Sequence, residues 1–227
     1  MERKVVFDLL YPKKATIYSD SIAATPHPTG SHTMKLLHLD SSILAENSAS
    51  RELSAAIVAR WQREVPGIEV IHRDLAGSHA LPHLDGAGLA KADAVQAARA
   101  QRALDEFLAA DVVVIGVPMY NFGIPSQLKA WIDRVAVAGQ TFRYTDAGPV
   151  GLAGGKKVIV AGTYGGLYPL EEGRNFIEPY LRQVFGFFGI DDVSFVTAEG
   201  LAISPEMRGK AMAAAHARIG EALPLAA

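Results

Sequence analysis

The chain has 227 residues, of which 49% are hydrophobic and 20% charged, and its formal net charge is −2. This length suits one domain with an appendage, and the hydrophobic content supports a sizeable core. The small net charge argues against a nucleic-acid surface or a polybasic membrane patch. Because the chain has no cysteine, disulfides, thiolate chemistry, iron–sulfur clusters and cysteine zinc sites are excluded.

The sequence shows neither a membrane-spanning segment nor a signal peptide. No apolar run reaches the roughly 18 residues that are needed to cross a bilayer. The apolar stretch Val5–Leu10 is short, contains an acid and is not followed by a clear cleavage site. We therefore expect a soluble cytoplasmic protein without a membrane partner.

Residues 1–33 differ from the remainder of the chain. They contain Pro12, Pro26, Pro28 and Gly30 among many hydroxyl residues, and they show no sustained period. We expect these residues to form an N-terminal extension outside the core, and residues 34–227 to form the folded domain. A real arm that packs on a partner is the alternative.

From Met34 onwards, strand patterns alternate with helix patterns. The expected strands are short apolar runs at residues 35–40, 69–73, 112–117, 157–162 and 193–198. The expected helices cover residues 50–65, 91–110, 125–138 and 176–188, and a last helix begins at Ser204–Pro205. This alternation predicts an α/β fold, a three-layer sandwich around a five-stranded parallel sheet. Ligands of such sheets bind beyond the carboxyl ends of the strands, so the loops there are the candidate site.

The loop after the first strand is rich in hydroxyl groups and contains no glycine. It is neither a Gly-x-Gly-x-x-Gly loop nor a Walker loop. Ser48 and Ser50 stand at the start of the expected helix, where free N–H groups and the helix dipole attract a phosphate. No lysine supplies charge to this cradle. Plain helix capping by Ser48 or Ser50 is the alternative, and it is the better one when the loop is considered alone.

Two more loops add to this pattern. The loop after the third strand carries Met119, Tyr120 and Phe122, which can border a flat apolar ring or fill the core under a neighbouring loop. After the fourth strand, Gly165 and Gly166 permit a close backbone approach to a ligand, or form an ordinary turn. Taken together at one edge of the sheet, the three loops favour a ligand site.

The segment Pro118–Asp133 (PMYNFGIPSQLKAWID) resembles the signature of the FMN-dependent NADH:quinone oxidoreductase and azoreductase family. Supporting similarities lie at Ser41–Leu44, Gly139–Tyr144 and Ala198–Gly200, in the same order as in the family. The resemblance extends from Met34 to about Leu223. It implies a flavodoxin-like fold with strand order 2-1-3-4-5, and a homodimer.

The resemblance also implies which residues hold the cofactor FMN. It assigns the phosphate to Ser42, Ser48, Ala49 and Ser50, with Ser41 in the same loop. It assigns the isoalloxazine ring to Met119, Tyr120, Asn121 and Phe122 on one side, and to Thr163, Tyr164, Gly165 and Gly166 on the other. Tyr120 and Phe122 are also candidates for the wall of the slot in which substrates stack.

The activity that the resemblance implies is hydride transfer from NADH or NADPH, through the flavin, to quinones or azo compounds in a ping-pong cycle. The flavin carries the chemistry, so no catalytic side chain and no metal is expected. His38 and His72 form no spaced metal pair along the sequence, and we expect structural roles for them. Trp131 and the aromatic helix 176–188 are expected in the core, with a dimer interface as the second interpretation.

Three other functions stay open at this point. The first is a flavin reductase with another acceptor, such as a nitroaromatic compound or a metal ion. The second is a one-electron carrier, which the net charge of −2 disfavours because carriers are usually strongly acidic. The third is a binding module that uses the same fold without a flavin.

Overall fold

The computed structural model describes residues 33–221. The expected extension at residues 1–33 lies outside this range except for Thr33, and so do residues 222–227. None of the helices in the described part combines the length and the hydrophobicity that a bilayer crossing requires.

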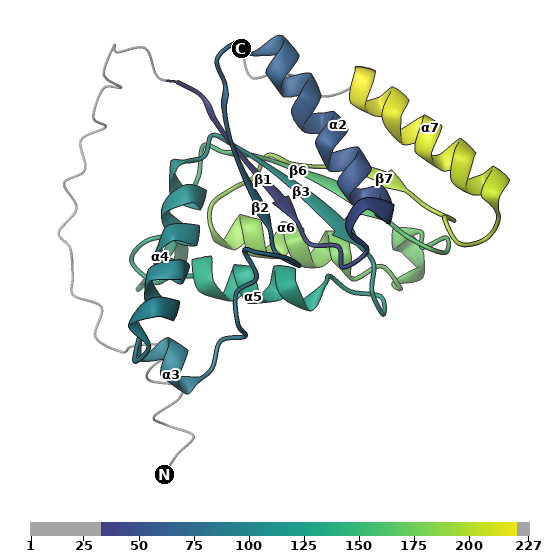
Figure 1. The fold of residues 1–227 in the computed structure, drawn as a ribbon. Helices are drawn as coiled ribbons and strands as arrows, with labels where there is room; N and C mark the ends of the chain where they lie inside the picture. The colour runs from purple at the N-terminus through teal and green to yellow at the C-terminus, as the bar shows by residue number, and fades with distance from the viewer. Residues whose placement is uncertain (1–32, 222–227) are drawn as a thin grey trace.

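The core is a five-stranded parallel sheet with helices on both faces (Figure 1). The strands lie side by side in the order β2 (Glu69–Asp74), β1 (Lys35–Asp40), β3 (Val112–Pro118), β6 (Lys157–Thr163) and β7 (Val193–Ala198). This is the expected order, because β6 and β7 are the fourth and fifth strands that the sequence predicts. Every residue of the central strand β3 is buried, as expected for a parallel strand covered on both faces.

Two helical layers enclose the sheet (Figure 1). One contains α2 (Ala49–Glu64) and α7 (Pro205–Glu221), and the other contains α4 (Ala94–Ala109), α5 (Ser126–Val135) and α6 (Ile177–Phe187). Alternate residues of β1 point to opposite faces of the sheet. Leu36 packs with the α2 residues Ile57 and Trp61 on one face. Leu37 belongs to the cluster on the other face, which contains Trp131 and Phe185. The expected core positions of Trp131 and Phe185 are thereby confirmed.

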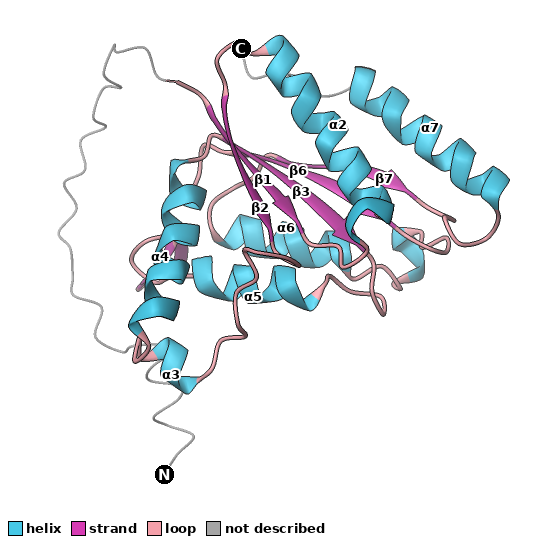
Figure 2. Cartoon of the chain, in the orientation of Figure 1, coloured by secondary structure: helices cyan, strands magenta, loops and turns pink. Residues whose placement is uncertain are grey.

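An antiparallel hairpin of β4 (Phe142–Thr145) and β5 (Gly148–Gly151) stands apart from the main sheet (Figure 2). The sequence pattern did not predict these strands. The hairpin packs closely on the end of α6, since a Cβ on Gly151 would lie 2.1 Å from the backbone nitrogen of Gly189. Glycine at position 151 therefore permits this backbone contact.

The ends of the helices agree with the signals in the sequence. Ser204 caps α7, because its Oγ accepts a hydrogen bond of 3.1 Å from the N–H of Met207. Gly189 follows α6 with φ +84°, the left-handed conformation that ends many helices. Pro125, the predicted first residue of the third helix, directly precedes α5, so the helix begins one residue after the predicted start, and it ends at Val135 rather than at the predicted Ala138. Short helical segments occupy Ala45–Asn47 (η1), Gly86–Leu89 (α3) and Leu170–Glu172 (η2).

Candidate functional site

The three loops singled out in the sequence meet at the carboxyl edge of the sheet. Strand β3 pairs with β1 on one side and with β6 on the other, so the loops that follow these strands are neighbours. Polar contacts join them on both sides of the second loop. The hydroxyl of Tyr120 lies 3.2 Å from the Oγ of Ser42, and the N–H of Met119 donates to the carbonyl of Thr163 at 2.9 Å.

The first loop ends in a cap at the start of α2. The Oγ of Ser48 accepts a hydrogen bond from the N–H of Arg51 at 3.3 Å and lies 3.0 Å from the Oγ of Ser50. Helix capping by Ser48 is thus confirmed. The cap leaves the N–H groups of Ala49 and Ser50 without a backbone acceptor in the described part of the chain. The same helix start can therefore be capped and still offer donors to an anion.

The other two serines of this loop differ in direction. Ser41 donates its hydroxyl to the carbonyl of Gly116 at 2.7 Å, so it ties the loop to β3. Ser42 accepts a hydrogen bond from the N–H of Leu44 at 3.2 Å and contacts the hydroxyl of Tyr120. Ser42, rather than Ser41, is therefore the hydroxyl that lies between the first and the second loop.

The aromatic loop is closed by two backbone hydrogen bonds between Tyr120 and Gly123, of 3.0 and 3.1 Å. Asn121 and Phe122 form its tip with φ of +49° and +67°, a region that side chains rarely adopt. Neither N–H group at the tip has a backbone acceptor within residues 33–221. Phe122 is 47% exposed, so it does not fill the core, whereas Met119 is partly buried against the core.

The loop after β6 offers backbone rather than side chains. Gly165 and Gly166 accept hydrogen bonds from Ala202 and Gly200 through their carbonyls, at 2.9 and 2.8 Å, while their N–H groups have no backbone acceptor among the described residues. Thr163 is buried at the end of the strand. Tyr164 is 1% exposed and its ring belongs to the core, where burial raises the pKa of its hydroxyl to about 12. The Tyr164 side chain is thus neutral and turned away from the rim.

Comparison with known proteins places this arrangement in a family. Residues 34–223 match the family described as having a flavodoxin-like fold. The chain is 56% identical over 186 residues to the FMN-dependent NADH:quinone oxidoreductase of Stenotrophomonas maltophilia, covering 82% of this chain and 94% of that protein. It is 58% identical over 188 residues to FMN-dependent NADH:quinone oxidoreductase 1 of Xanthomonas euvesicatoria, with coverages of 83% and 96%. The chain belongs to the FMN-dependent NADH:quinone oxidoreductase family.

A solved structure supports this assignment. The crystal structure of an azoreductase from Bacillus anthracis has a TM-score of 0.75 and 29% sequence identity, over 83% of this chain and 97% of that one. The resemblance inferred from Pro118–Asp133 is thereby confirmed. In this family member, the segment forms the end of β3, the aromatic loop and most of α5.

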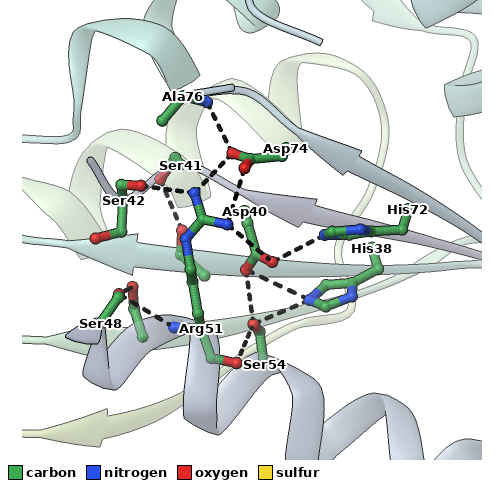
Figure 3. A network of polar contacts seen from close by, with 12 residues as sticks. His38, Asp40, Ser41, Ser42, Ser48, Arg51, Ser54, His72, Asp74 and Ala76 are labelled. Atoms are coloured by element: carbon green, nitrogen blue, oxygen red, sulfur yellow. Dashed lines mark hydrogen bonds and ion pairs between the residues drawn. The ribbon is translucent and has the colours of Figure 1, made fainter. Parts of the chain in front are cut away.

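An arginine that the sequence analysis missed lies behind the first loop (Figure 3). The guanidinium of Arg51 donates to both carboxylate oxygens of Asp74, at 2.7 and 3.0 Å, and to the carbonyl of Ser42 at 2.8 Å. Hydrogen bonding to Asp74 raises the pKa of Arg51. Because Asp74 neutralises this charge, the cradle keeps the near-neutral character that the sequence predicts, and Arg51 serves to hold the loop.

The donor groups of this rim fit FMN. A phosphate requires hydrogen-bond donors, which the first turn of α2 and the hydroxyls of Ser48 and Ser50 provide. A ring system with polar edges requires donors in a second place, which the tip of the aromatic loop and the Gly165–Gly166 turn provide. The residues present therefore match both ends of the cofactor.

Proposed function

We propose that this chain binds FMN at the rim and uses it to pass hydride from NADH or NADPH to quinones, and to cleave azo bonds reductively. Residues 34–227 form the FMN-binding domain in this proposal. Within it, the phosphate is assigned to Ser42, Ser48, Ala49 and Ser50. The ring is assigned to Met119–Phe122 and Thr163–Gly166. The observation that carries the proposal is the three sets of backbone N–H groups that have no backbone acceptor within the described residues 33–221 and that lie on adjacent loops. Bound FMN supplies the hydride chemistry that no side chain can perform.

The role of the aromatic loop follows from its fixed shape. The Tyr120–Gly123 hydrogen bonds hold the N–H groups of Asn121 and Phe122 in place before any ligand arrives. Donors held in this way stabilise developing negative charge without reorganisation. A non-glycine residue with positive φ costs on the order of 1 kcal/mol or more, and such strain is concentrated at functional sites.

The substrate slot is assigned to the apolar side of the same loop. A cavity of about 550 Å³ lies beside it, and its lining includes Gly123, Ile124, Phe176 and Tyr180. Flat conjugated rings, such as those of nicotinamide and quinone, suit an apolar wall. Phe122 does not line the cavity itself, but its carbonyl accepts a hydrogen bond from the N–H of the lining residue Phe176. It is our candidate for the edge of the slot, because the hydroxyl of Tyr120 is engaged with the first loop. One slot for both substrates implies a ping-pong cycle, in which the oxidised donor leaves before the acceptor enters.

We extend the proposal to a homodimer. Large apolar side chains are exposed around the rim, with Phe122 at 47%, Leu167 at 54%, Leu170 at 47% and Phe176 at 59%. Exposed apolar groups that cluster in this way commonly mark a contact with another protein surface. A second copy of the chain would cover them and close the slot. Light scattering coupled to size-exclusion chromatography tests this, and a mass of one chain at micromolar concentration would reject it.

The activity is tested on the FMN-reconstituted protein. Under anaerobic conditions we expect NADH or NADPH to bleach the bound flavin, and a quinone to restore the yellow colour. Initial rates with quinones and azo dyes, measured at several donor concentrations, should give the parallel double-reciprocal lines of a ping-pong cycle. A protein that stays colourless after FMN addition would be a binding module of another kind. A protein whose flavin NADH cannot bleach would be an electron carrier.

A further inference from the structure

Strand pairing brings two histidines together on the α2 side of the sheet. His38 of β1 and His72 of β2 are register partners, and their ring centroids are 4.6 Å apart. Asp40 follows His38 by two residues, so its side chain emerges on the same face. All three residues lie beneath the first turns of α2, where Ser54 contacts both Asp40 and His38.

The nitrogen and oxygen donors of this group converge on one point (Figure 3). The Nε2 of His72 lies 2.9 Å from Asp40 Oδ2, and the Nε2 of His38 lies 3.5 Å from Asp40 Oδ1. The three donor atoms are all within 4.8 Å of one another. Ligands of a tetrahedral zinc ion, each about 2.0–2.1 Å from the metal, are roughly 3.3 Å apart. The two separations, each to a different oxygen of Asp40, bracket this value.

The ligand set identifies the class of metal. Two imidazoles and one carboxylate suit divalent ions such as Zn²⁺ and Co²⁺, whereas Mg²⁺ and Ca²⁺ prefer oxygen ligands alone. Three protein ligands also leave a coordination position for water. The side chain of His72 is 49% exposed, because β2 is the edge strand, so water and metal ions can reach the group from that side.

Neighbouring groups hold these ligands in position. Ser54 donates its hydroxyl to Asp40 Oδ1 at 2.9 Å and thereby orients the carboxylate. The side chains of His38 and Asp40 are only 10% and 6% exposed, so packing fixes both. Arg51 lies 4.0 Å from Asp40 Oδ2, but its charge is paired with Asp74. The charges of Asp40, Asp74 and Arg51 sum to −1, and this net negative charge favours binding of a cation.

We propose that His38, Asp40 and His72 form a binding site for a zinc-class divalent metal ion. The ion would cross-link β1 and β2 near their carboxyl ends. Its ligand Asp40 directly precedes Ser41, where the first loop begins. Its role would be structural, since the group lies against Ser54 of α2 and joins two neighbouring strands. Spacing along the chain could not reveal the site, because the two histidines stand on different strands and meet only through the register of β1 and β2.

The test uses the FMN-loaded protein without a polyhistidine tag, after removal of metals with a chelator. We expect calorimetry to show one equivalent of Zn²⁺ bound per chain, and Co²⁺ to give the visible absorption of tetrahedral imidazole coordination. His72→Gln removes one ligand at a half-exposed position, where the fold tolerates the change. Loss of a residue that only hydrogen-bonds to a metal ligand typically weakens metal binding at least about tenfold. Loss of the ligand His72 itself should therefore weaken Zn²⁺ binding by at least this factor.

His216→Gln is the matched control, because His216 pairs with Glu52 on the surface, outside this group. This variant should bind Zn²⁺ as the wild type does. Zn²⁺ should also raise the unfolding temperature of the wild type and the control, but not that of His72→Gln. The proposal is overturned if the wild type shows no saturable uptake of one equivalent. Equal affinities of the wild type and His72→Gln would overturn it as well.

Discussion

The hydroxyl of Tyr120 lies 3.2 Å from the Oγ of Ser42 and accepts a hydrogen bond of 3.2 Å from the N–H of Ile43. This one side chain therefore connects the loop proposed for the flavin ring with the loop proposed for its phosphate. The two loops are 78 residues apart in the sequence. Their relative position is thus set by a side chain that also belongs to the site.

Replacing Tyr120 by phenylalanine should loosen this connection and keep the aromatic ring. A net hydrogen bond is worth about 0.5–1.5 kcal/mol, so we expect the dissociation constant of FMN to rise about 2- to 10-fold. Quenching of flavin fluorescence on titration measures this. Tyr168→Phe serves as the control, because its hydroxyl forms no hydrogen bond with the first loop. Equal losses in the two variants would show that the contact between Tyr120 and Ser42 does not organise the cofactor site.

The proposed phosphate position can be separated from helix capping at Ser48. Aspartate and asparagine cap helices as well as serine does, so Ser48→Asp and Ser48→Asn should both retain the stability of α2. Only the aspartate places a negative charge against the phosphate. Two charges about 4 Å apart near a protein surface repel by on the order of 1–4 kcal/mol, so FMN affinity should fall at least about fivefold in Ser48→Asp alone.

Riboflavin, which lacks the phosphate, provides the internal control for this pair. Its affinity should be the same in Ser48→Asp and Ser48→Asn. If the two variants also bind FMN equally, the phosphate lies elsewhere than at the start of α2.

Much of the fold was predictable because local patterns and tertiary structure agree. The run Val112–Val117 is β-branched and apolar because β3 is buried on both faces, and the residues after each strand fall at one edge because the strands are parallel. The hairpin of β4 and β5 was not predicted. Its two-residue turn is Asp146–Ala147, which lacks the Asn-Gly or Asp-Gly pair that normally identifies such turns.

The parts of the site that escaped prediction depend on partners distant in the sequence. Ser48 could be placed because a cap is a local signal. The pairing of Arg51 with Asp74 requires the end of β2 to lie beside α2, and the contact of His38 with His72 requires one particular strand register. The direction of the Tyr164 ring, into the core and not the rim, depends on the packing of residues that no local pattern specifies.

Gly116 is expected to be irreplaceable for the packing of α2. A Cβ at this position would lie 3.0 Å from Asp40 Oδ1, 3.0 Å from the carbonyl oxygen of Ser50 and 3.2 Å from the Oγ of Ser54. Because these groups are buried, Gly116→Ala should lower the free energy of unfolding by about 1–3 kcal/mol. Gly209→Ala is the matched control on the exposed surface of α7, in its second turn, where a Cβ meets nothing within 4 Å.

The control should shift stability in the opposite direction, by up to about 1 kcal/mol, because alanine is the better helix former. Urea unfolding of the two variants beside the wild type measures both effects. A Gly116→Ala protein as stable as the wild type would mean that α2 can move away from β3 without cost.

Stability at alkaline pH should depend on the buried hydroxyl of Tyr164. Burial raises its pKa from 10.0 to about 12, so between these values the unfolded chain loses the proton while the folded chain keeps it. The contribution of this group is therefore fully present below pH 10 and is lost as pH rises towards 12. Two pKa units correspond to roughly 2–3 kcal/mol of unfolding free energy.

Urea unfolding across this pH interval, for the wild type and Tyr164→Phe, isolates that contribution. Burial also raises the pKa of Tyr180 to about 12, so the variant should keep a shallower decline rather than none. The double variant Tyr164→Phe/Tyr180→Phe should also lose the part of the decline in unfolding free energy that Tyr180 causes. The contrary outcome is a pair of parallel curves of unfolding free energy against pH for the wild type and Tyr164→Phe between pH 10 and 12. The Tyr164 hydroxyl would then have the same pKa in the folded and the unfolded chain. Its burial in the core cluster with Ile177 and Leu181 would not raise its pKa.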